Sequence, residues 1–146
     1  MYGMIVVGHG SWALGMTSAV NLIVGDIAHY IPLEFLAEEP LEALPEKLND
    51  ALDTLLRETD GVLIFADLIG GTPYKTAFTI ASERTNVAVL GGTNLGMVIE
   101  AHFARTAVGD LPGLARDLEE KGKSHVAYVA GVEPLADEPE DFSDGI

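Results

Sequence analysis

Short runs of apolar residues alternate along the chain with longer segments in which apolar residues recur at helical spacing. The short runs predict buried strands at residues 4–7, 30–36, 61–66, 86–90 and 125–130. The amphipathic segments predict helices over residues 11–24, 41–57, 72–82, 95–105 and 111–121. Elements that alternate in this order are typical of a three-layer α/β fold, with an open, mostly parallel sheet and helices on both of its faces.

Glycine and proline sharpen several of these boundaries. Gly25 is expected to end the first helix, and Pro45 fits the first turn of the second. Pro32 cannot donate to a sheet ladder, so its strand is expected at an edge of the sheet. Thr72 is expected to cap the third helix, with Pro73 at its first position.

Composition narrows the class of protein. The chain has 146 residues, enough for one domain of ordinary size, and contains no cysteine. Its 8 basic and 23 acidic residues give a net charge of −15, which disfavours nucleic acid and anionic membrane surfaces and favours a basic protein partner. No apolar stretch approaches the ~18 residues of a membrane-spanning helix, and no secretion signal is recognised. A cytoplasmic location is the expectation.

Three glycine-rich loops follow predicted strands, at residues 8–10, 70–72 and 91–93. The carboxyl ends of parallel strands meet at one edge of an open sheet, where ligand chemistry is usually found. The sequence therefore predicts a functional site built from these loops.

His9 and Asp67 are the reactive candidates at this edge. Each lies at or just beyond the end of an apolar strand, and neighbouring strands would bring the two side chains together. A carboxylate that accepts a hydrogen bond from one imidazole nitrogen fixes the tautomer and leaves the other nitrogen free as a nucleophile. Glycines on both sides of His9 would let an anion or another protein approach closely. A packing role is the alternative for a single histidine at a strand end.

Gly70, Gly71 and Thr72 form the second candidate element. A glycine turn that enters a helix presents backbone N–H groups and the positive end of the helix dipole, which suits a phosphoryl group. An ordinary capped helix is the alternative, and a phosphoryl-binding role is favoured only if the segment faces His9.

Dinucleotide binding is a competing interpretation of the first loop. Gly8-His-Gly-Ser-Trp-Ala13 formally fits G-x-G-x-x-G/A, and Glu34 lies roughly where an acidic ribose ligand belongs. The bulky histidine and the small number of strands argue against it. The remaining histidines, His29, His102 and His125, show no metal-ligand spacing with each other or with His9, so neither a metal nor a cofactor is predicted.

Three segments together resemble a known family: V-V-G-H-G-S-W-A-L-G, F-A-D-L-I-G-G-T-P and G-G-T-N-L-G-M-V-I-E. They are similar to the enzyme IIA domains of the mannose-family sugar phosphotransferase system, in order and at the family's spacing, over roughly residues 1–130. The resemblance implies a cytoplasmic phosphocarrier that receives a phosphoryl group from phospho-HPr on a histidine. The group then passes to a IIB protein, which serves the membrane components IIC and IID.

Carried over by position, the resemblance makes His9 the phosphorylated residue, Asp67 the carboxylate that orients it, and Gly70–Thr72 the segment that steadies the phosphoryl group. It also implies a homodimer that exchanges an antiparallel C-terminal strand, here around residues 125–130. Gly96 departs from the proline of the family's third loop. A related domain that serves dihydroxyacetone kinase stays as an alternative. Residues 131–146 are expected to form a separate acidic tail, with six acidic residues and no basic one.

Overall fold

The two central strands of the sheet are almost wholly buried, as their continuous apolar sequences require. The computed structural model describes residues 1–107 and 109–131. Its sheet is parallel, in the order β2-β1-β3-β4, and consists of β1 (Gly3–His9), β2 (Tyr30–Phe35), β3 (Val62–Ala66) and β4 (Val87–Leu90). Both β1 and β3 therefore have a neighbour on each side, and β2 and β4 form the edges.

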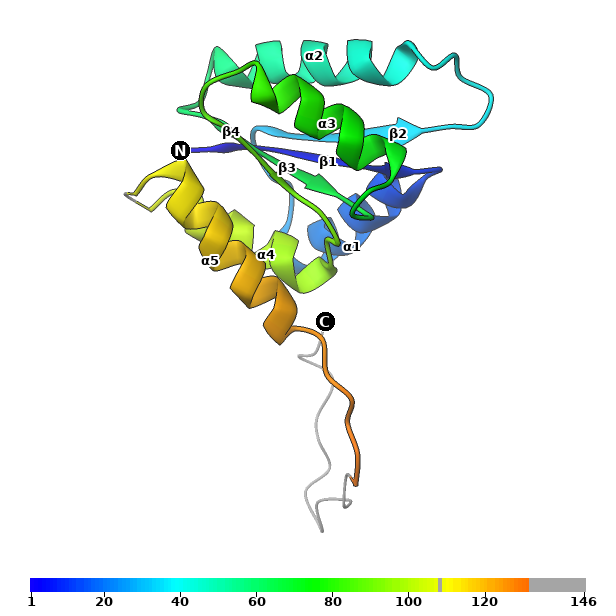
Figure 1. Ribbon diagram of the computed structural model, residues 1–146. Coiled ribbons are helices and arrows are strands. Elements are labelled where there is room, and N and C mark those ends of the chain that lie inside the picture. The colour runs from blue at the N-terminus through cyan, green and yellow to red at the C-terminus, as the bar shows by residue number, and fades with distance from the viewer. Residues whose placement is uncertain (108, 132–146) are drawn as a thin grey trace.

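Helices cover both faces of the sheet (Figure 1). One face carries α2 (Ala43–Leu56) and α3 (Thr72–Ser82), and the other carries α1 (Trp12–Val24), α4 (Leu95–Ala104) and α5 (Leu111–Ser124). The predicted three-layer α/β architecture is confirmed, and the strand with Pro32 lies at an edge as expected.

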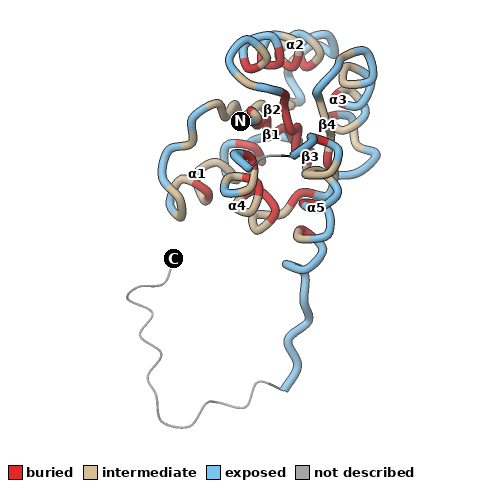
Figure 2. Tube along the Cα trace, turned by 90° about the vertical axis from the view of Figure 1, so that its left-hand side faces the viewer, coloured by how far each residue is buried: buried red, intermediate tan, exposed pale blue. Residues whose placement is uncertain are grey.

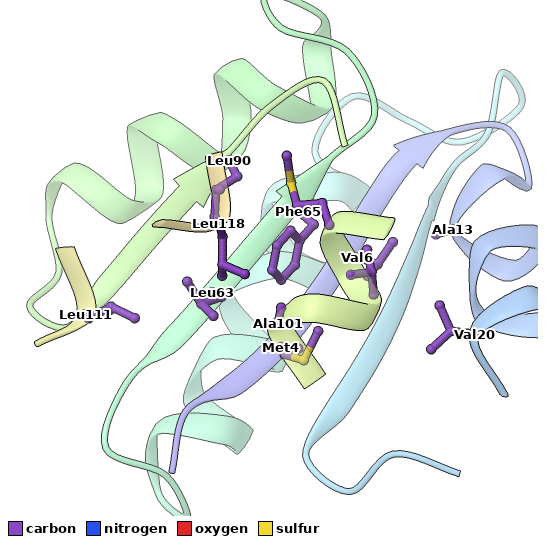
Figure 3. Packing of buried hydrophobic residues seen from close by; sticks show 12 residues of the cluster. Met4, Val6, Ala13, Val20, Leu63, Phe65, Leu90, Ala101, Leu111 and Leu118 are labelled. Carbon is purple, nitrogen blue, oxygen red and sulfur yellow. The ribbon is translucent and has the colours of Figure 1, made fainter. Parts of the chain in front are cut away.

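Side chains that alternate along the central strands build one apolar core on each face. Met4 and Val6 of β1 lie with Leu63 and Phe65 of β3 in the core beneath α1, α4 and α5, as Figure 3 shows. The opposite core receives Ile5 and Val7 together with the predicted helical leucines Leu44, Leu48, Leu52 and Leu55. Burial is accordingly concentrated between the layers (Figure 2), and each such leucine gains roughly 1.5–3 kcal/mol by leaving water.

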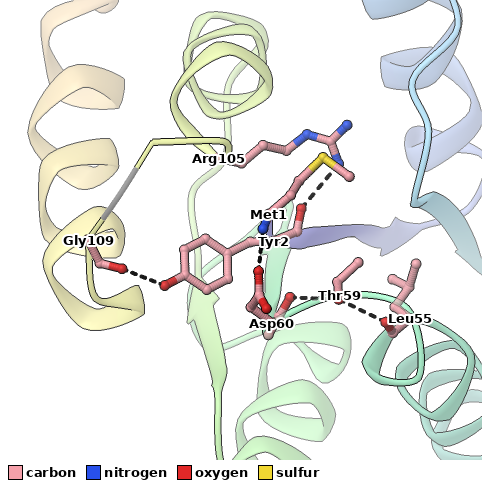
Figure 4. A network of polar contacts seen from close by, with 8 residues as sticks. Met1, Tyr2, Leu55, Thr59, Asp60, Arg105 and Gly109 are labelled. Atoms are coloured by element: carbon pink, nitrogen blue, oxygen red, sulfur yellow. Dashed lines mark hydrogen bonds and ion pairs between the residues drawn. The ribbon is translucent and has the colours of Figure 1, made fainter.

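A polar network fastens the amino ends of the central strands (Figure 4). The Tyr2 hydroxyl donates to the Gly109 carbonyl at 2.7 Å, and the buried Arg105 guanidinium donates to the Tyr2 carbonyl at 3.1 Å. The N-terminal amine pairs with Asp60. These contacts lie at the edge of the sheet opposite the glycine loops, so the loop edge is left free for chemistry.

Helix boundaries follow the predictions closely, with one correction. Gly25 ends α1 at φ +80°, as expected. Thr72, however, is the first residue of α3, and Gly71 occupies the capping position without any side-chain hydrogen bond. The side-chain caps that the structure does show, at Asn94 of α4 and Asp110 of α5, were not predicted.

The predicted last strand does not form within this chain. Helix α5 continues to Ser124, and residues 126–130 follow as exposed, irregular backbone that pairs with no strand of the described chain. A strand needs a neighbour to satisfy its backbone groups, and residues 126–130 have none among the described residues. The predicted acidic tail lies outside the described residues except for Gly131. Among the helices of the described ranges, none is long and apolar enough to span a bilayer.

Candidate active site

The carboxyl ends of β1 and β3 bring His9 and Asp67 together. The two strands are adjacent and parallel, with Val7 opposite Ala66 in the register. The Asp67 backbone N–H donates to the Val7 carbonyl at 3.2 Å, which holds the start of the second glycine loop against β1. Strand β1 also continues through Gly8 and His9, which were predicted to lie in a turn. His9 therefore stands on rigid sheet backbone.

One carboxylate oxygen of Asp67 binds His9 twice. Asp67 Oδ2 lies 2.9 Å from the His9 backbone nitrogen and 2.8 Å from the ring nitrogen Nδ1. With an ionised carboxylate, Nδ1 must carry the hydrogen, so the lone pair of the neutral ring resides on Nε2. The Asp67 side chain is 13% exposed and that of His9 is 45% exposed. The carboxylate is thus sheltered while the imidazole remains accessible.

Two further residues confine the His9 ring. The ring of Phe35 meets it edge-on, with centroids 5.7 Å apart at 73°. Gly71 lies so near that a β-carbon there would stand 2.8 Å from His9 Cε1. Phe35 was not among the site residues predicted from the sequence. Its position at the end of the edge strand was the available signal, since His9 and Phe35 are paired in the register of β1 and β2.

The absence of a side chain at Gly8 leaves space for Asp67, the candidate orienting carboxylate. A β-carbon at Gly8 would lie 2.5 Å from the Trp12 ring and 2.9 Å from Asp67 Cγ. The space above Gly8 is therefore occupied by two side chains. In a dinucleotide fingerprint it is the second glycine, here Gly10, that approaches the pyrophosphate, and a β-carbon at Gly10 would meet nothing within 4 Å among the described residues.

The second glycine loop leads into the N-terminus of α3 beside the His9 ring. Gly70 takes φ +80°, a conformation that favours glycine. The Gly71 N–H donates to the Leu68 carbonyl at 3.2 Å, so it is engaged within the loop. The amides of Gly70 and Thr72 have no protein acceptor among the described residues. Of the three predicted phosphoryl-binding residues, Gly70 and Thr72 therefore have backbone N–H groups available to donate to a ligand. Gly71 lacks a side chain and so leaves space beside the His9 ring.

The third glycine loop is organised by its own contacts. The Asn94 side chain accepts from the Met97 N–H at 2.9 Å and donates to the Gly122 carbonyl at 2.8 Å. Gly96 faces the His125 imidazole, where a β-carbon would lie 2.3 Å from the ring. A proline side chain at position 96 would overlap the same ring, which gives the departure from the family pattern a structural reason.

His29 and His125 each lie near a single carboxylate. His29 pairs with Glu58 at 3.2 Å, and His125 lies 3.7 Å from Glu100. Within the described chain, no cluster of three His, Cys, Asp or Glu side chains could hold a metal ion.

Comparison with known proteins gives a consistent result. The family model described as "PTS system fructose IIA component" matches residues 3–118. The sorbose-specific EIIA component of Lacticaseibacillus casei is 31% identical over 97 residues, which cover 66% of this chain and 69% of the relative. The mannose-specific EIIAB component of Escherichia coli is 31% identical over 102 residues, which cover 69% of this chain and 31% of that longer protein.

A solved structure extends the similarity to the fold. The mannose/sorbose-specific IIA subunit of the phosphotransferase system from Enterococcus faecalis has a TM-score of 0.79 and 30% identity, covering 90% of this chain and 97% of that one. Residues 3–118, which the family model matches, include the whole sheet, the His9 and Asp67 loops and α5 as far as Leu118. The chain therefore belongs to the family of mannose-type IIA components of the sugar phosphotransferase system.

Proposed function

We propose that this protein is a histidine phosphocarrier that accepts a phosphoryl group from phospho-HPr on His9 and passes it to a IIB protein. The observation that carries the proposal is the pairing of His9 Nδ1 with Asp67 Oδ2 at 2.8 Å, which directs the free ring nitrogen outward. Family membership supplies the class of reaction, and the site supplies the acceptor.

In the forward step, the lone pair of His9 Nε2 attacks the phosphorus of the donor phosphohistidine. The new N–P bond forms as the N–P bond to the donor imidazole breaks, and that imidazole leaves with the electron pair. His9 then carries the phosphoryl group on Nε2 and the hydrogen on Nδ1, so its ring gains cationic character. The Asp67 carboxylate stabilises this charge and holds the hydrogen in place. Transfer to the IIB protein reverses these changes on His9.

Weak binding of the phosphoryl group suits a protein that passes it from one histidine to another. Transfer between two histidines needs similar free energies on both, so tight binding of the phosphoryl group would trap it on the carrier. The amides of Gly70 and Thr72 with the α3 N-terminus provide a modest electrostatic hold. Gly71, which lies against the ring, keeps the space beside the nucleophile open.

The surface beside His9 suits docking by another protein. Leu68 and Ile69 are 58% and 67% exposed, directly after Asp67 in the chain. Large apolar residues so exposed next to a site are typical of contact surfaces. The net charge of −15 favours partners with a basic face, the role proposed for HPr and the IIB protein. The Escherichia coli relative is an EIIAB component, which supports a IIB partner. These partners imply a cytoplasmic location, with the membrane components IIC and IID reached through IIB.

A homodimer is part of the proposal, and two exposed features support it. Strand β4 pairs only with β3 in the described chain, and beside it lies a hollow of about 290 Å³ whose lining includes Ile69, Tyr74 and Val89. The segment after α5 exposes Val126, Tyr128 and Val129 by 74%, 91% and 70%. An apolar segment without a neighbour and an unpaired strand edge are complementary, so we propose that 125–130 of each chain pairs with β4 of the other.

Light scattering after gel filtration tests the dimer. The double substitution Tyr128→Pro with Val129→Pro removes adjacent backbone N–H groups, which point to opposite sides of a strand, and is expected to give a monomer. The matched variant with threonine at both positions retains strand-forming residues and should stay dimeric. A monomeric native chain would overturn the proposed exchange.

The phosphocarrier proposal is tested by intact mass after incubation with phosphoenolpyruvate, enzyme I and HPr. We expect a gain of one phosphoryl group (about 80 Da) that is labile in acid and stable in base, as the N–P bond of a phosphohistidine is. His9→Ala should abolish the gain. His29→Asn is the control, because His29 lies at the opposite edge of the sheet and asparagine tolerates its φ of +55°.

Two outcomes would contradict the proposal. Labelling that persists in His9→Ala would assign the acceptor elsewhere, and no labelling of the native protein would reject the carrier role. Saturable binding of NAD or ATP by calorimetry, without labelling, would instead revive the nucleotide-binding interpretation.

A further inference from the structure

Two buried polar atoms at the carboxyl edge of the sheet have no hydrogen-bond partner among the described residues. One is Asp67 Oδ1, the carboxylate oxygen that does not contact His9, and the other is the hydroxyl oxygen of Thr93. Thr93 is only 8% exposed. A buried hydroxyl or carboxylate oxygen without a partner costs free energy, so such atoms are rarely left unsatisfied in folded proteins.

The backbone places these two side chains at the same strand end. The Thr93 N–H donates to the carbonyl of Ala66, the residue directly before Asp67, at 3.2 Å. The loop that carries Thr93 therefore crosses the carboxyl end of β3, at the point where the loop that begins with Asp67 leaves that strand.

The Asp67 side chain and the Thr93 backbone also lie on the same face of the sheet. Phe65 packs in the core beneath α1 and α4, and Ala66 packs in the opposite core. Alternation returns Asp67 to the Phe65 side, as its closeness to the Trp12 ring across Gly8 shows. Thr93 immediately precedes Asn94, which caps α4 on that same face. The ribbon of α4 passes over Phe65 in Figure 3.

We propose that Thr93 is a positioning residue for phosphoryl transfer, and that its hydroxyl donates a hydrogen bond to Asp67 Oδ1. The proposal deepens the phosphocarrier function and rests on it. Rotation of the Thr93 side chain about its Cα–Cβ bond turns the hydroxyl toward Oδ1 and satisfies both orphaned atoms in one contact, while Oδ2 keeps its contacts with His9. Asp67 is then held by its two oxygens, one toward Thr93 and the other toward His9, so the carboxylate cannot turn away from Nδ1.

The consequence for His9 is a fixed tautomer. Nδ1 keeps its hydrogen only while Oδ2 stays in place to accept it, and a carboxylate free to rotate would weaken that bond. The tautomer with hydrogen on Nε2 has its lone pair on Nδ1, beside Asp67, and has none on the accessible nitrogen to attack phosphorus. Loss of the Thr93 hydroxyl should therefore reduce the reactive fraction of His9 without touching the ring.

The test compares Thr93→Val, which has nearly the same shape without the hydroxyl, with Thr93→Ser, which keeps the hydroxyl without the methyl group. The first readout is the tautomer of His9, from ¹⁵N shifts of the imidazole in the unphosphorylated full chain. The second is the rate of phosphoryl acceptance from phospho-HPr. We expect Thr93→Val to lose much of the Nδ1–H tautomer and to accept the group about tenfold more slowly. Thr93→Ser should retain both properties.

Two results would overturn the inference. If Thr93→Val matches the native protein in both readouts, the hydroxyl does not hold Asp67. If Thr93→Ser is as impaired as Thr93→Val, the methyl group acts through packing. A variant that unfolds is recognised by its amide spectrum, and Thr93→Cys, of similar size with only a weak donor, then takes the place of valine. The tautomer is measured without any phosphoryl donor, so it decides the role of Thr93 even if the carrier function fails.

Discussion

The α-carbon of Gly71 faces the imidazole edge of His9, and a β-carbon there would stand 2.8 Å from His9 Cε1 and 3.5 Å from Nε2. Gly71 itself has φ −70° and ψ 165°, a conformation open to any residue. The glycine is therefore required by the neighbouring ring and not by its own backbone. This separates it from Gly70, whose φ of +80° favours glycine for conformational reasons.

Gly71→Ala should consequently impair His9 by contact alone. The methyl group would push the ring from its position against Asp67, and we expect phosphoryl acceptance to slow by about tenfold or more. Stability should fall by only about 0.5–1 kcal/mol, since alanine caps a helix less well than glycine. Rapid-quench mixing with phospho-HPr measures the rate of phosphoryl acceptance, and urea unfolding measures the loss of stability.

Gly15→Ala provides the matched control. A β-carbon at Gly15, within α1, meets nothing within 4 Å. The substitution should stabilise the helix by about 0.5–1 kcal/mol and leave phosphoryl acceptance unchanged. If Gly71→Ala accepts the phosphoryl group as fast as the native protein, the ring is not confined as the geometry indicates.

Much of the fold could be predicted because its signals are local. The apolar runs of β1 and β3, the leucine stripe of α2 and the proline of β2 each reflect burial or backbone chemistry of their own segment. The contact of His9 with Asp67 depends on β1 and β3 being neighbours, which local pattern does not determine. The sequence therefore named both residues, and the sheet order brought them together.

The features that escaped prediction depend on register or on residues distant in the sequence. Phe35 reaches His9 only through the pairing of β2 with β1. Thr93 meets the end of β3 because the last glycine loop crosses it. The predicted strand at 125–130 shows the converse, since its apolar alternation is genuine but no strand of the described residues pairs with it. Hydrophobic pattern indicates that a segment can be a strand, and the pairing partner decides whether it becomes one.

Asn94 joins the start of α4 to the end of α5, and its two hydrogen bonds can be separated by mutation. Asn94→Ser should cost about 1 kcal/mol, because serine still caps the helix but is too short to reach the Gly122 carbonyl. Asn94→Ala loses both bonds and should cost about 2 kcal/mol. Urea unfolding with unchanged m-values measures both. Equal costs for serine and alanine would show that the capping bond to Met97 contributes nothing.

His125 and Gly96 should be energetically coupled. A β-carbon at position 96 would lie 2.3 Å from the His125 ring, so Gly96→Ala must displace that ring and its contact with Glu100. We expect the substitution to destabilise the native protein by about 0.5–1 kcal/mol, within the range of measured coupling between touching residues. In a His125→Ala background the obstacle is gone, and the same change should be neutral or stabilising because alanine favours helix over glycine. Additive effects in the double-mutant cycle would contradict the contact.

His102 should make the protein less stable in mild acid. Burial of the ring lowers its pKa, and the positive charge of Arg105 lowers that pKa further. Its Nδ1 is buried and has no hydrogen-bond partner in the part of the chain that the structure describes. As the pH falls below the ordinary value of about 6.5, the unfolded chain binds a proton at this position before the folded chain does. The free energy of unfolding therefore decreases until the pH passes below the lowered pKa of the folded state.

His102→Gln removes this titration, so the stability of the native protein relative to the variant should decline between pH 7.5 and 5.5. Urea unfolding of both proteins across that range measures the difference, in which the contributions of the unchanged His29 and His125 cancel. A stability difference that does not vary with pH would show that His102 is protonated equally readily in both states.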